Sequence, residues 1–234
     1  MSEPIVNVQQ VTKTYHQGAV DVHALQNVSL SVNAGDFAVL AGPSGSGKTT
    51  LLNMIGALDR PTRGRISIGG KDAAALKGGE LARLRLHHVG FVFQAYNLIP
   101  VLTAYENAEY VLLLQGVAAS ERKRRVTEIL SSVGLGGLED RRPRELSGGQ
   151  QQRVAVARAI VAAPDLVLAD EPTANLDSRS ALDLIDLMKR LNRERSVTFV
   201  VSSHDARVID RAGRVVLLED GKIVRDERQS TDDS

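Results

Sequence analysis

Residues 42–49 read Gly-Pro-Ser-Gly-Ser-Gly-Lys-Thr, which fits the pattern Gly-x-x-x-x-Gly-Lys-Ser/Thr. Glycines let the backbone wrap closely around a polyphosphate, and the loop amides and the start of a following helix attract its negative oxygens. Lys48 is expected to reach the β- and γ-phosphates and the Thr49 hydroxyl to bind Mg²⁺. The pattern therefore predicts binding of a nucleoside triphosphate. The predicted nucleotide contacts are Gly42, Pro43, Ser44, Gly45, Ser46, Gly47, Lys48, Thr49 and Thr50.

Two adjacent carboxylates, Asp170 and Glu171, end an apolar run that starts at Leu166. An Asp at the end of a strand beside a phosphate loop holds Mg²⁺ in many NTPases. The neighbouring Glu can polarise an attacking water. Adjacent acids at a strand end can also be merely exposed to solvent, but the phosphate loop upstream favours the catalytic interpretation.

A second glycine-containing segment, Leu-Ser-Gly-Gly-Gln-Gln-Gln-Arg at 146–153, precedes an apolar, helix-like run. Ser147 is a plausible N-cap, and Gly148 and Gly149 leave the amides at the helix start open. Such a helix start can bind an anion, as the phosphate loop does. The alternative is an ordinary capped helix, which Pro164 ends.

The strands and helices that must position these groups alternate along the chain. An apolar run at 37–41 precedes the phosphate loop, and helices are predicted after 48, 150 and 177, the last over 178–195. Apolar strands of this kind suit a buried, mostly parallel sheet. The other predicted strands are 5–10 and 25–32, around a polar loop at 16–23, followed by 165–169, 197–202 and 214–218.

Composition limits the possible classes of protein. The 234 residues suffice for one buried core plus a lobe. With 29 basic and 28 acidic residues the net charge is +1, so no direct binding of nucleic acid is expected. The basic run at 121–125 is interpreted as a solvated helix face. No apolar stretch approaches the roughly 18 residues of a membrane span, and no secretory signal pattern is present. Any membrane role is therefore expected to depend on a partner.

Six motifs together resemble those of an ABC-type ATPase, over essentially residues 5–225. The segment Leu-Ser-Gly-Gly-Gln is the specific one, because phosphate loops occur in many NTPase families. The motifs, in chain order, look like Walker A at 42–49, the Q-loop at Gln94, the signature at 146–150, Walker B at 168–171, the D-loop at 175–177 and the switch histidine His204.

The resemblance implies an α/β fold: a P-loop NTPase core with a mostly parallel sheet, an N-terminal antiparallel β part and an inserted α-helical subdomain. Residues 1–94 and 164–225 are expected to form the ATP-binding core and 95–163 the helical subdomain. The polar segment 226–234 is expected to be a disordered tail.

The resemblance also assigns roles. Two copies are expected to pair head to tail, each sandwiching Mg-ATP between its own phosphate loop and the signature of its partner. Expected roles are stacking on adenine for Tyr15, contact with Mg²⁺ and water for Gln94, Mg²⁺ ligation for Thr49 and Asp170, general base for Glu171, contact with the γ-phosphate for His204, communication across the dimer for Asp177, and signature contacts for Ser147, Gly148, Gly149 and Gln150.

The expected partner is an integral-membrane permease, which would hold the chain at the cytoplasmic face of the inner membrane. In the family, the segment after Gln94 forms the groove for the permease's coupling helix. Apolar side chains there could mark an interface, although local packing of the helical lobe would also explain them. They are Tyr96, Leu98, Ile99 and Leu102.

Segments 58–64, 81–85 and 91–94 look most like the branch of lipoprotein-releasing and macrolide-exporting ATPases. The permeases of this branch have few membrane spans and large extracytoplasmic domains. The complexes of ATPase and permease extract cargo, export it or transmit motion across the membrane. The alternatives are a polar amino-acid importer ATPase and, from another class, a soluble ABC protein that acts on DNA or the ribosome. The cargo itself is not specified by any motif.

Overall fold

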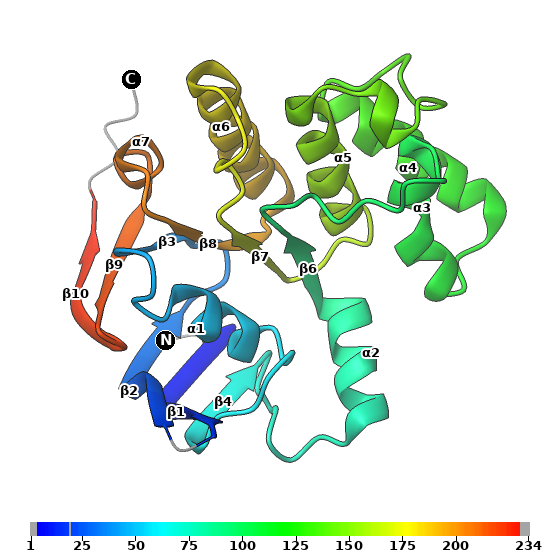
Figure 1. Ribbon diagram of the computed structural model, residues 1–234. Coiled ribbons are helices and arrows are strands. Elements are labelled where there is room, and N and C mark those ends of the chain that lie inside the picture. Colours follow the sequence, from blue (N-terminus) through cyan, green and yellow to red (C-terminus); the bar gives the residue numbers. More distant parts are fainter. Residues whose placement is uncertain (1–3, 19, 230–234) are drawn as a thin grey trace. The chain divides into compact units, whose positions relative to one another are not determined.

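The computed structural model describes residues 4–18 and 20–229 (Figure 1). Its contacts divide the chain into two compact units, one made of residues up to 83 together with those from 198 onward, the other of residues 84–197. The second unit therefore extends on both sides of the expected helical subdomain, 95–163. Helix α2 (Gly78–His88) runs across the boundary at residue 83.

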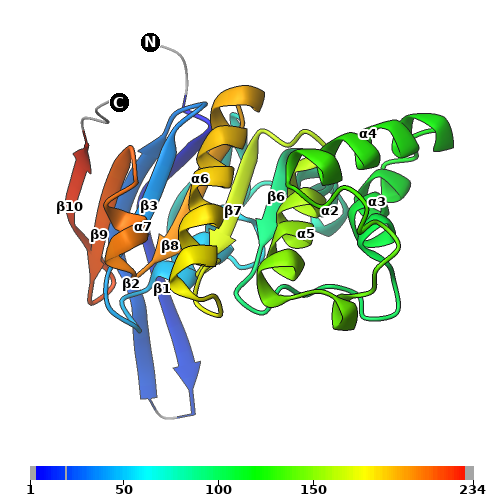
Figure 2. The same ribbon diagram turned by 90° about the horizontal axis from the view of Figure 1, so that it is seen from above.

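An antiparallel sheet in the first unit has the order β2-β1-β4-β5, which confirms the expected N-terminal β part. Strands β1 (Val6–Gln17) and β2 (Val20–Val32) form one long hairpin, whose far end Figure 2 shows projecting. The predicted polar loop at 16–23 is therefore wrong. Cross-strand polar pairs extend the ladder past the apolar part: Nδ1 of His16 lies 2.6 Å from the Asp21 carboxylate. Strands β4 (Arg63–Ile68) and β5 (Lys71–Asp72) complete the sheet.

A second set of strands in this unit is mostly parallel, as expected. Strand β3 (Phe37–Ala41) pairs in parallel with β8 (Thr198–Ser203) and β9 (Arg214–Glu219). All five residues of β3 are buried, which suits a strand covered on both faces. Helix α1 (Lys48–Ile55) contacts β2 and β4 as well as β8, so it packs against both sheets. The short helix α7 (Ala206–Ile209) follows β8.

The last strand corrects the expected tail. Strand β10 (Lys222–Arg228) pairs antiparallel with β9, so residues 226–228 are ordered in a sheet. Charge pairing compensates for their polarity, because Asp226 accepts two hydrogen bonds of 2.7 Å from Arg214. Residues 230–234 of the expected tail lie outside the described residues.

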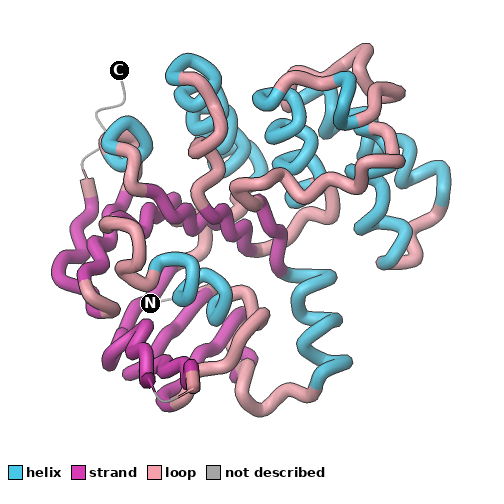
Figure 3. Tube along the Cα trace, viewed as in Figure 1, coloured by secondary structure: helices cyan, strands magenta, loops and turns pink. Residues whose placement is uncertain are grey.

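The second unit contains the parallel pair β6 (Val89–Val92) and β7 (Leu166–Asp170). Along the chain, helices lie between these two strands and after them; Figure 3 colours helices and strands differently. The helical character predicted for 95–163 is confirmed, and the helix predicted over 178–195 has those bounds, with Ile185, Met188 and Leu191 buried. The helices are α3 (Ala104–Leu114), α4 (Ala119–Ser132), the 3-10 turn η1 (Pro143–Glu145), α5 (Gly148–Ile160) and α6 (Ser178–Arg195).

Candidate active site

The phosphate loop connects β3 to α1 in the first unit, and backbone atoms of other segments pack closely against its glycines. A Cβ on Gly42 would lie 2.2 Å from the carbonyl oxygen of Leu218, and one on Gly47 would lie 2.6 Å from that of Ala24. Both glycines also have positive φ, 144° and 102°. The Gly221 amide donates a 3.1 Å hydrogen bond to the Ser46 carbonyl. Only glycine fits these positions, which explains the spacing of the motif.

Lys48 is 6% exposed, and its ammonium is directed back at the loop. Its Nζ donates to the carbonyls of Gly42 at 2.8 Å and Pro43 at 2.9 Å. Among the described residues, four helices begin with a capping side chain, but the N-cap of α1 is Gly47, and no side chain caps this helix. The fixed ammonium of Lys48 and the amides at the uncapped start of α1 both attract negative charge, so together they suit the binding of a polyphosphate. The capping residues of the other helices are Thr103, Ser147, Asp177 and Asp205.

Two further predicted residues lie in the first unit. His204 directly follows β8, and its predecessor Ser203 is the register partner of Ala41, which precedes the phosphate loop. His204 and Gly42 therefore leave neighbouring strands at the same edge of the sheet. Tyr15 lies in β1, half-buried, and its hydroxyl donates a 2.7 Å hydrogen bond to Asp59. Thr50, in the first turn of α1, partly offsets the rise in the pKa of Tyr15 that burial and Asp59 cause.

The carboxylates and Gln94 lie in the second unit. Asp170 ends β7, and Glu171 follows with φ of 45°, a left-handed conformation that is uncommon for Glu. The register pairs Val92 with Ala169, so Gln94 follows β6 at the edge where β7 ends. The side-chain amide of Asn175 donates a 3.0 Å hydrogen bond to the Gln94 carbonyl. Gln94, Asp170 and Glu171 thus share one edge of the β6–β7 pair.

The predicted N-cap at Ser147 is confirmed by a capping box at the start of α5. Ser147 Oγ accepts from the Gln150 amide at 3.3 Å, and Gln150 Oε1 accepts from the Ser147 amide at 2.9 Å. These bonds use neither the Gly148 nor the Gly149 amide. A Cβ on Gly148 would lie 2.9 Å from the Tyr96 hydroxyl, so a larger residue would displace that side chain.

Asp177 caps α6 by accepting 3.0 Å hydrogen bonds from the amides of Arg179 and Ser180. Hydrogen bonds from the Ser180 side chain and from both amides hold the pKa of Asp177 below its ordinary value. Its expected role across a dimer stays a prediction.

Two residues of α5 that the motifs did not single out hold the segment around Gln94. Gln152 is fully buried and donates through Nε2 to the carbonyls of Pro172 at 2.8 Å and Phe93 at 3.4 Å. Arg158 donates to the carbonyls of Tyr96 at 3.0 Å and Asn97 at 2.6 Å. Burial lowers the pKa of Arg158. The signal that could have identified Gln152 from the sequence is its position as a polar residue on the apolar face of a predicted helix, because a buried polar group needs hydrogen-bond partners.

Replacing Gln152 with Leu should lower the free energy of unfolding by about 1 kcal/mol, because the carbonyls of Phe93 and Pro172 lose their amide donor. The variant also removes the buried, unpartnered Oε1, which offsets part of that cost. Denaturant unfolding measures the change. Gln151→Leu is the matched control, since Gln151 is half-buried and its Nε2 donates a 3.1 Å hydrogen bond to the Leu146 carbonyl. Equal effects of the two substitutions would contradict the assignment.

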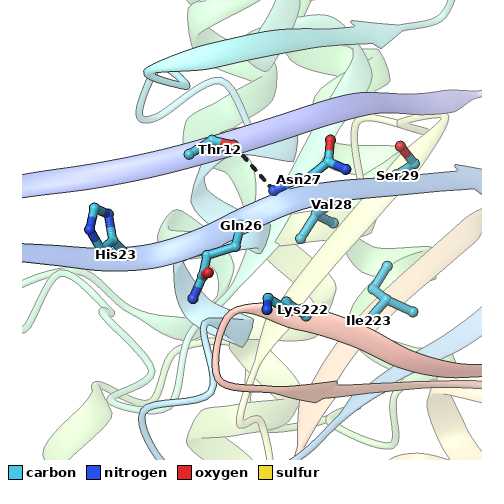
Figure 4. A pocket seen from close by; sticks show the side chains of 8 residues that line it. All are labelled: Thr12, His23, Gln26, Asn27, Val28, Ser29, Lys222 and Ile223. Carbon is cyan, nitrogen blue, oxygen red and sulfur yellow. Dashed lines mark hydrogen bonds between the residues drawn. The ribbon is translucent and has the colours of Figure 1, made fainter.

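A hollow of about 780 Å³ lies between β2 and β10 (Figure 4). It opens where β2 bulges: Asn27 has φ of 53°, and its amide donates a 3.1 Å hydrogen bond to Thr12 Oγ1. None of the residues predicted to contact nucleotide lines it, so this hollow is not the predicted site. The lining residues are Thr12, His23, Gln26, Asn27, Val28, Ser29, Lys222 and Ile223.

Comparisons with known proteins agree with the motifs. Residues 25–174 match the family model described as ABC transporter. The chain is 48% identical to the lipoprotein-releasing system ATP-binding protein LolD of Anaeromyxobacter dehalogenans, over 97% of this chain and 95% of that protein. It is 45% identical to an uncharacterized ABC transporter ATP-binding protein of Thermotoga maritima, over 96% of each chain.

A longer relative and a solved structure add detail. The macrolide export ATP-binding/permease protein MacB of Hyphomonas neptunium is 45% identical over 97% of this chain, which spans only 35% of that protein. A dimeric ATP-binding cassette in a post-hydrolysis state, bound to ADP and Pi, has a TM-score of 0.88 and 43% identity, with 95% of this chain and 98% of that chain covered.

Proposed function

We propose, from the premise that this chain belongs to the ABC transporter family as an ATP-hydrolysing subunit, that it drives a permease which releases lipoproteins, extracts lipids or exports a substrate. The observation that carries the proposal is the 48% identity to LolD over nearly the full length of both chains. MacB, a protein named for macrolide export, supports the same branch.

Among the described residues, no three His, Asp or Glu side chains are grouped so as to hold a metal ion by themselves. Mg²⁺ that binds together with ATP takes part of its ligands from phosphate and water, so a hydroxyl and one carboxylate suit it. We assign these ligands to Thr49 and Asp170, with Gln94 as a further contact. Bound Mg-ATP would supply a γ-phosphoryl group that water can attack.

Around that group, Lys48 and the amides at the start of α1 would neutralise phosphate charge. Glu171 would accept the proton of the attacking water, and His204 would contact the γ-phosphate. The conformation of Glu171 supports its role, because uncommon backbone conformations are concentrated at functional sites. The position of His204 beside the loop-bearing strand β3 supports contact with phosphate.

Two copies would pair head to tail, with each signature contacting the ATP held by the partner's loop. The similar cassette that binds ADP and Pi is dimeric, which supports this arrangement. The start of α5 supports it as well, since its capping box leaves the Gly148 and Gly149 amides out. Hydrolysis would remove the charge that joins the two copies.

The permease would dock on exposed apolar side chains of α3 and the preceding loop, and hold the chain at the cytoplasmic face of the inner membrane. No helix of the described residues is long and apolar enough to cross a bilayer. The expected groove residues Tyr96, Leu98, Ile99 and Leu102 are half-buried. Their neighbours are more open: Val101 is 72% exposed, Tyr110 45%, Leu113 49% and Leu114 55%. We call these last four side chains the α3 surface.

The double substitution Leu113→Glu/Leu114→Glu should release the protein from membranes that contain its permease. Two carboxylates in an apolar interface would be desolvated without partners, which costs several kcal/mol. Membrane flotation measures the association, and ATP affinity should stay at the wild-type value. Val224→Glu is the control, because Val224 is 54% exposed on β10. Retained association in the double variant would contradict docking at the α3 surface.

The proposed function is tested by tagging the chain, solubilising native membranes in mild detergent and identifying what copurifies. We expect a permease with few spans and a large extracytoplasmic domain. A many-span permease with a solute-binding protein would make the chain an importer ATPase. Recovery only with ribosomes or DNA would overturn the transporter assignment.

A further inference from the structure

Tyr15 is held by a cluster that the six motifs do not include. Its hydroxyl donates to Asp59 Oδ2 at 2.7 Å. Lys13 Nζ donates to the other oxygen of the same carboxylate, also at 2.7 Å, and to the Arg60 carbonyl at 2.8 Å. The same ammonium lies over the Tyr15 ring, 4.7 Å from its centroid. The ring is therefore fixed at its edge by Asp59 and covered on one face by Lys13.

Asp59 is itself fixed by the backbone. Its amide donates to the Asn53 carbonyl at 3.3 Å, and Oδ1 accepts from the Arg60 amide at 2.7 Å. Burial raises the pKa of Asp59, but hydrogen bonds from Lys13, Tyr15 and the Arg60 amide outweigh it and keep that pKa low. Burial, the hydrogen bond to Asp59 and its charge raise the pKa of Tyr15. The carboxylate is thus charged and the phenol protonated at neutral pH.

We propose that Asp59 and Lys13 are positioning residues for the nucleotide base: they fix the Tyr15 ring so that the base stacks on the face opposite Lys13. This inference rests on the proposed binding of ATP with Tyr15 as the platform for its base. Neither residue touches the reacting phosphates, so both act on affinity through the ring. The phenol hydroxyl is used by Asp59, which leaves the ring's π-face for the base.

Helix α1 links this cluster to the phosphate loop. The helix has 8 residues, from Lys48 to Ile55, and so is roughly 12 Å long. The phosphate loop leads into its first turn, while Asp59 is bound through its amide to Asn53 in its last turn. The base platform and the phosphate loop are thereby attached to the two ends of one helix. Asp59 sets where the base can lie relative to the phosphates.

Stacking of a base on an aromatic ring corresponds to roughly a 5- to 150-fold gain in affinity. Tyr15→Ala should lose that gain. Asp59→Asn and Lys13→Met keep the ring but hold it less firmly, because the first removes the charge of the carboxylate and the second removes the ammonium over the ring. They should raise the Kd for ATP by roughly 3- to 10-fold. Inorganic tripolyphosphate has no base, and its Kd should be unchanged in all three variants.

The test is calorimetric titration of each full-length variant with ATP and with tripolyphosphate. Asp72→Asn is the matched control: Asp72 is a half-buried carboxylate of the same unit that accepts a 2.9 Å hydrogen bond from the Ala74 amide. It should change neither affinity. Tyr15→Phe removes the hydrogen bond between Tyr15 and Asp59, and Asp59→Asn weakens the same bond. Combining the two should therefore cost less than the sum of the single changes.

The outcomes separate the inference from the function it rests on. Wild-type ATP affinity in Tyr15→Ala would overturn the role of Tyr15 itself. Weaker binding in Tyr15→Ala with wild-type affinity in Asp59→Asn and Lys13→Met would overturn only the positioning role. Equal weakening of ATP and tripolyphosphate in Asp59→Asn would show a general structural defect and would also overturn it.

Discussion

Replacing Glu171 with Gln should abolish ATP turnover and leave an ATP-bound dimer that does not separate. The amide keeps the size of the carboxylate but does not accept the proton of the attacking water. Loss of a general base lowers turnover by about 10²- to 10⁴-fold. Binding should persist, because the phosphate loop and Lys48 are unchanged. Phosphate release and light scattering with ATP measure the two effects.

The chain contains a matched control for this change. Asp220 directly follows Glu219, the last residue of β9, as Glu171 follows Asp170 at the end of β7. Its φ of 46° is nearly that of Glu171, 45°. Asp220→Asn therefore alters an acid in the same local setting that has no proposed part in the chemistry, and should turn over ATP at the wild-type rate. Unchanged turnover in Glu171→Gln would remove Glu171 from its proposed role.

Replacing Lys48 with Ala should raise the Kd for ATP by roughly 10- to 150-fold, the equivalent of losing one hydrogen bond from a charged donor, about 1.5 to 3 kcal/mol. Lys48 is 6% exposed and its ammonium already lies in the loop, so little ordering of the side chain is needed on binding. Its removal also leaves the Gly42 and Pro43 carbonyls without that donor. Titration with ATP measures the loss.

Lys71→Ala is the control for charge alone, since Lys71 is an exposed lysine of the same unit. It should bind ATP with wild-type affinity at physiological salt, where exposed charges are screened. A denaturation curve for Lys48→Ala must show a folded protein before its affinity is interpreted. Wild-type affinity in a folded Lys48→Ala protein would contradict the phosphate-loop assignment.

Local patterns predicted elements whose signals are local. The bounds of α6 were predicted from its helical period, and Ser147 was recognised as a cap from the residues around it. Strand β3 was evident because five apolar residues precede a glycine-rich loop. These features depend on neighbours within a few positions along the chain.

Features that depend on distant partners were missed. The β1–β2 hairpin continues through polar residues because the two strands support each other, and β10 is held by Arg214 through Asp226. Strand β6 has four residues, too few for a clear period. At the site, Gln152 and Asp59 carry no motif, because their importance comes from carbonyls and side chains that only the fold brings to them.

The contacts that Leu218 and Gly221 make with the phosphate loop determine when the protein becomes able to bind ATP during its synthesis. The loop is translated early, but Leu218 and Gly221, which contact Gly42 and Ser46, follow about 175 residues later. At ordinary rates of translation that interval is roughly 10 to 30 seconds. Throughout it the ribosome carries a chain with the complete motif but without the hairpin that shapes it. Capture of ATP is therefore a late event in the life of the nascent chain, reached only when the β9–β10 hairpin has left the ribosome.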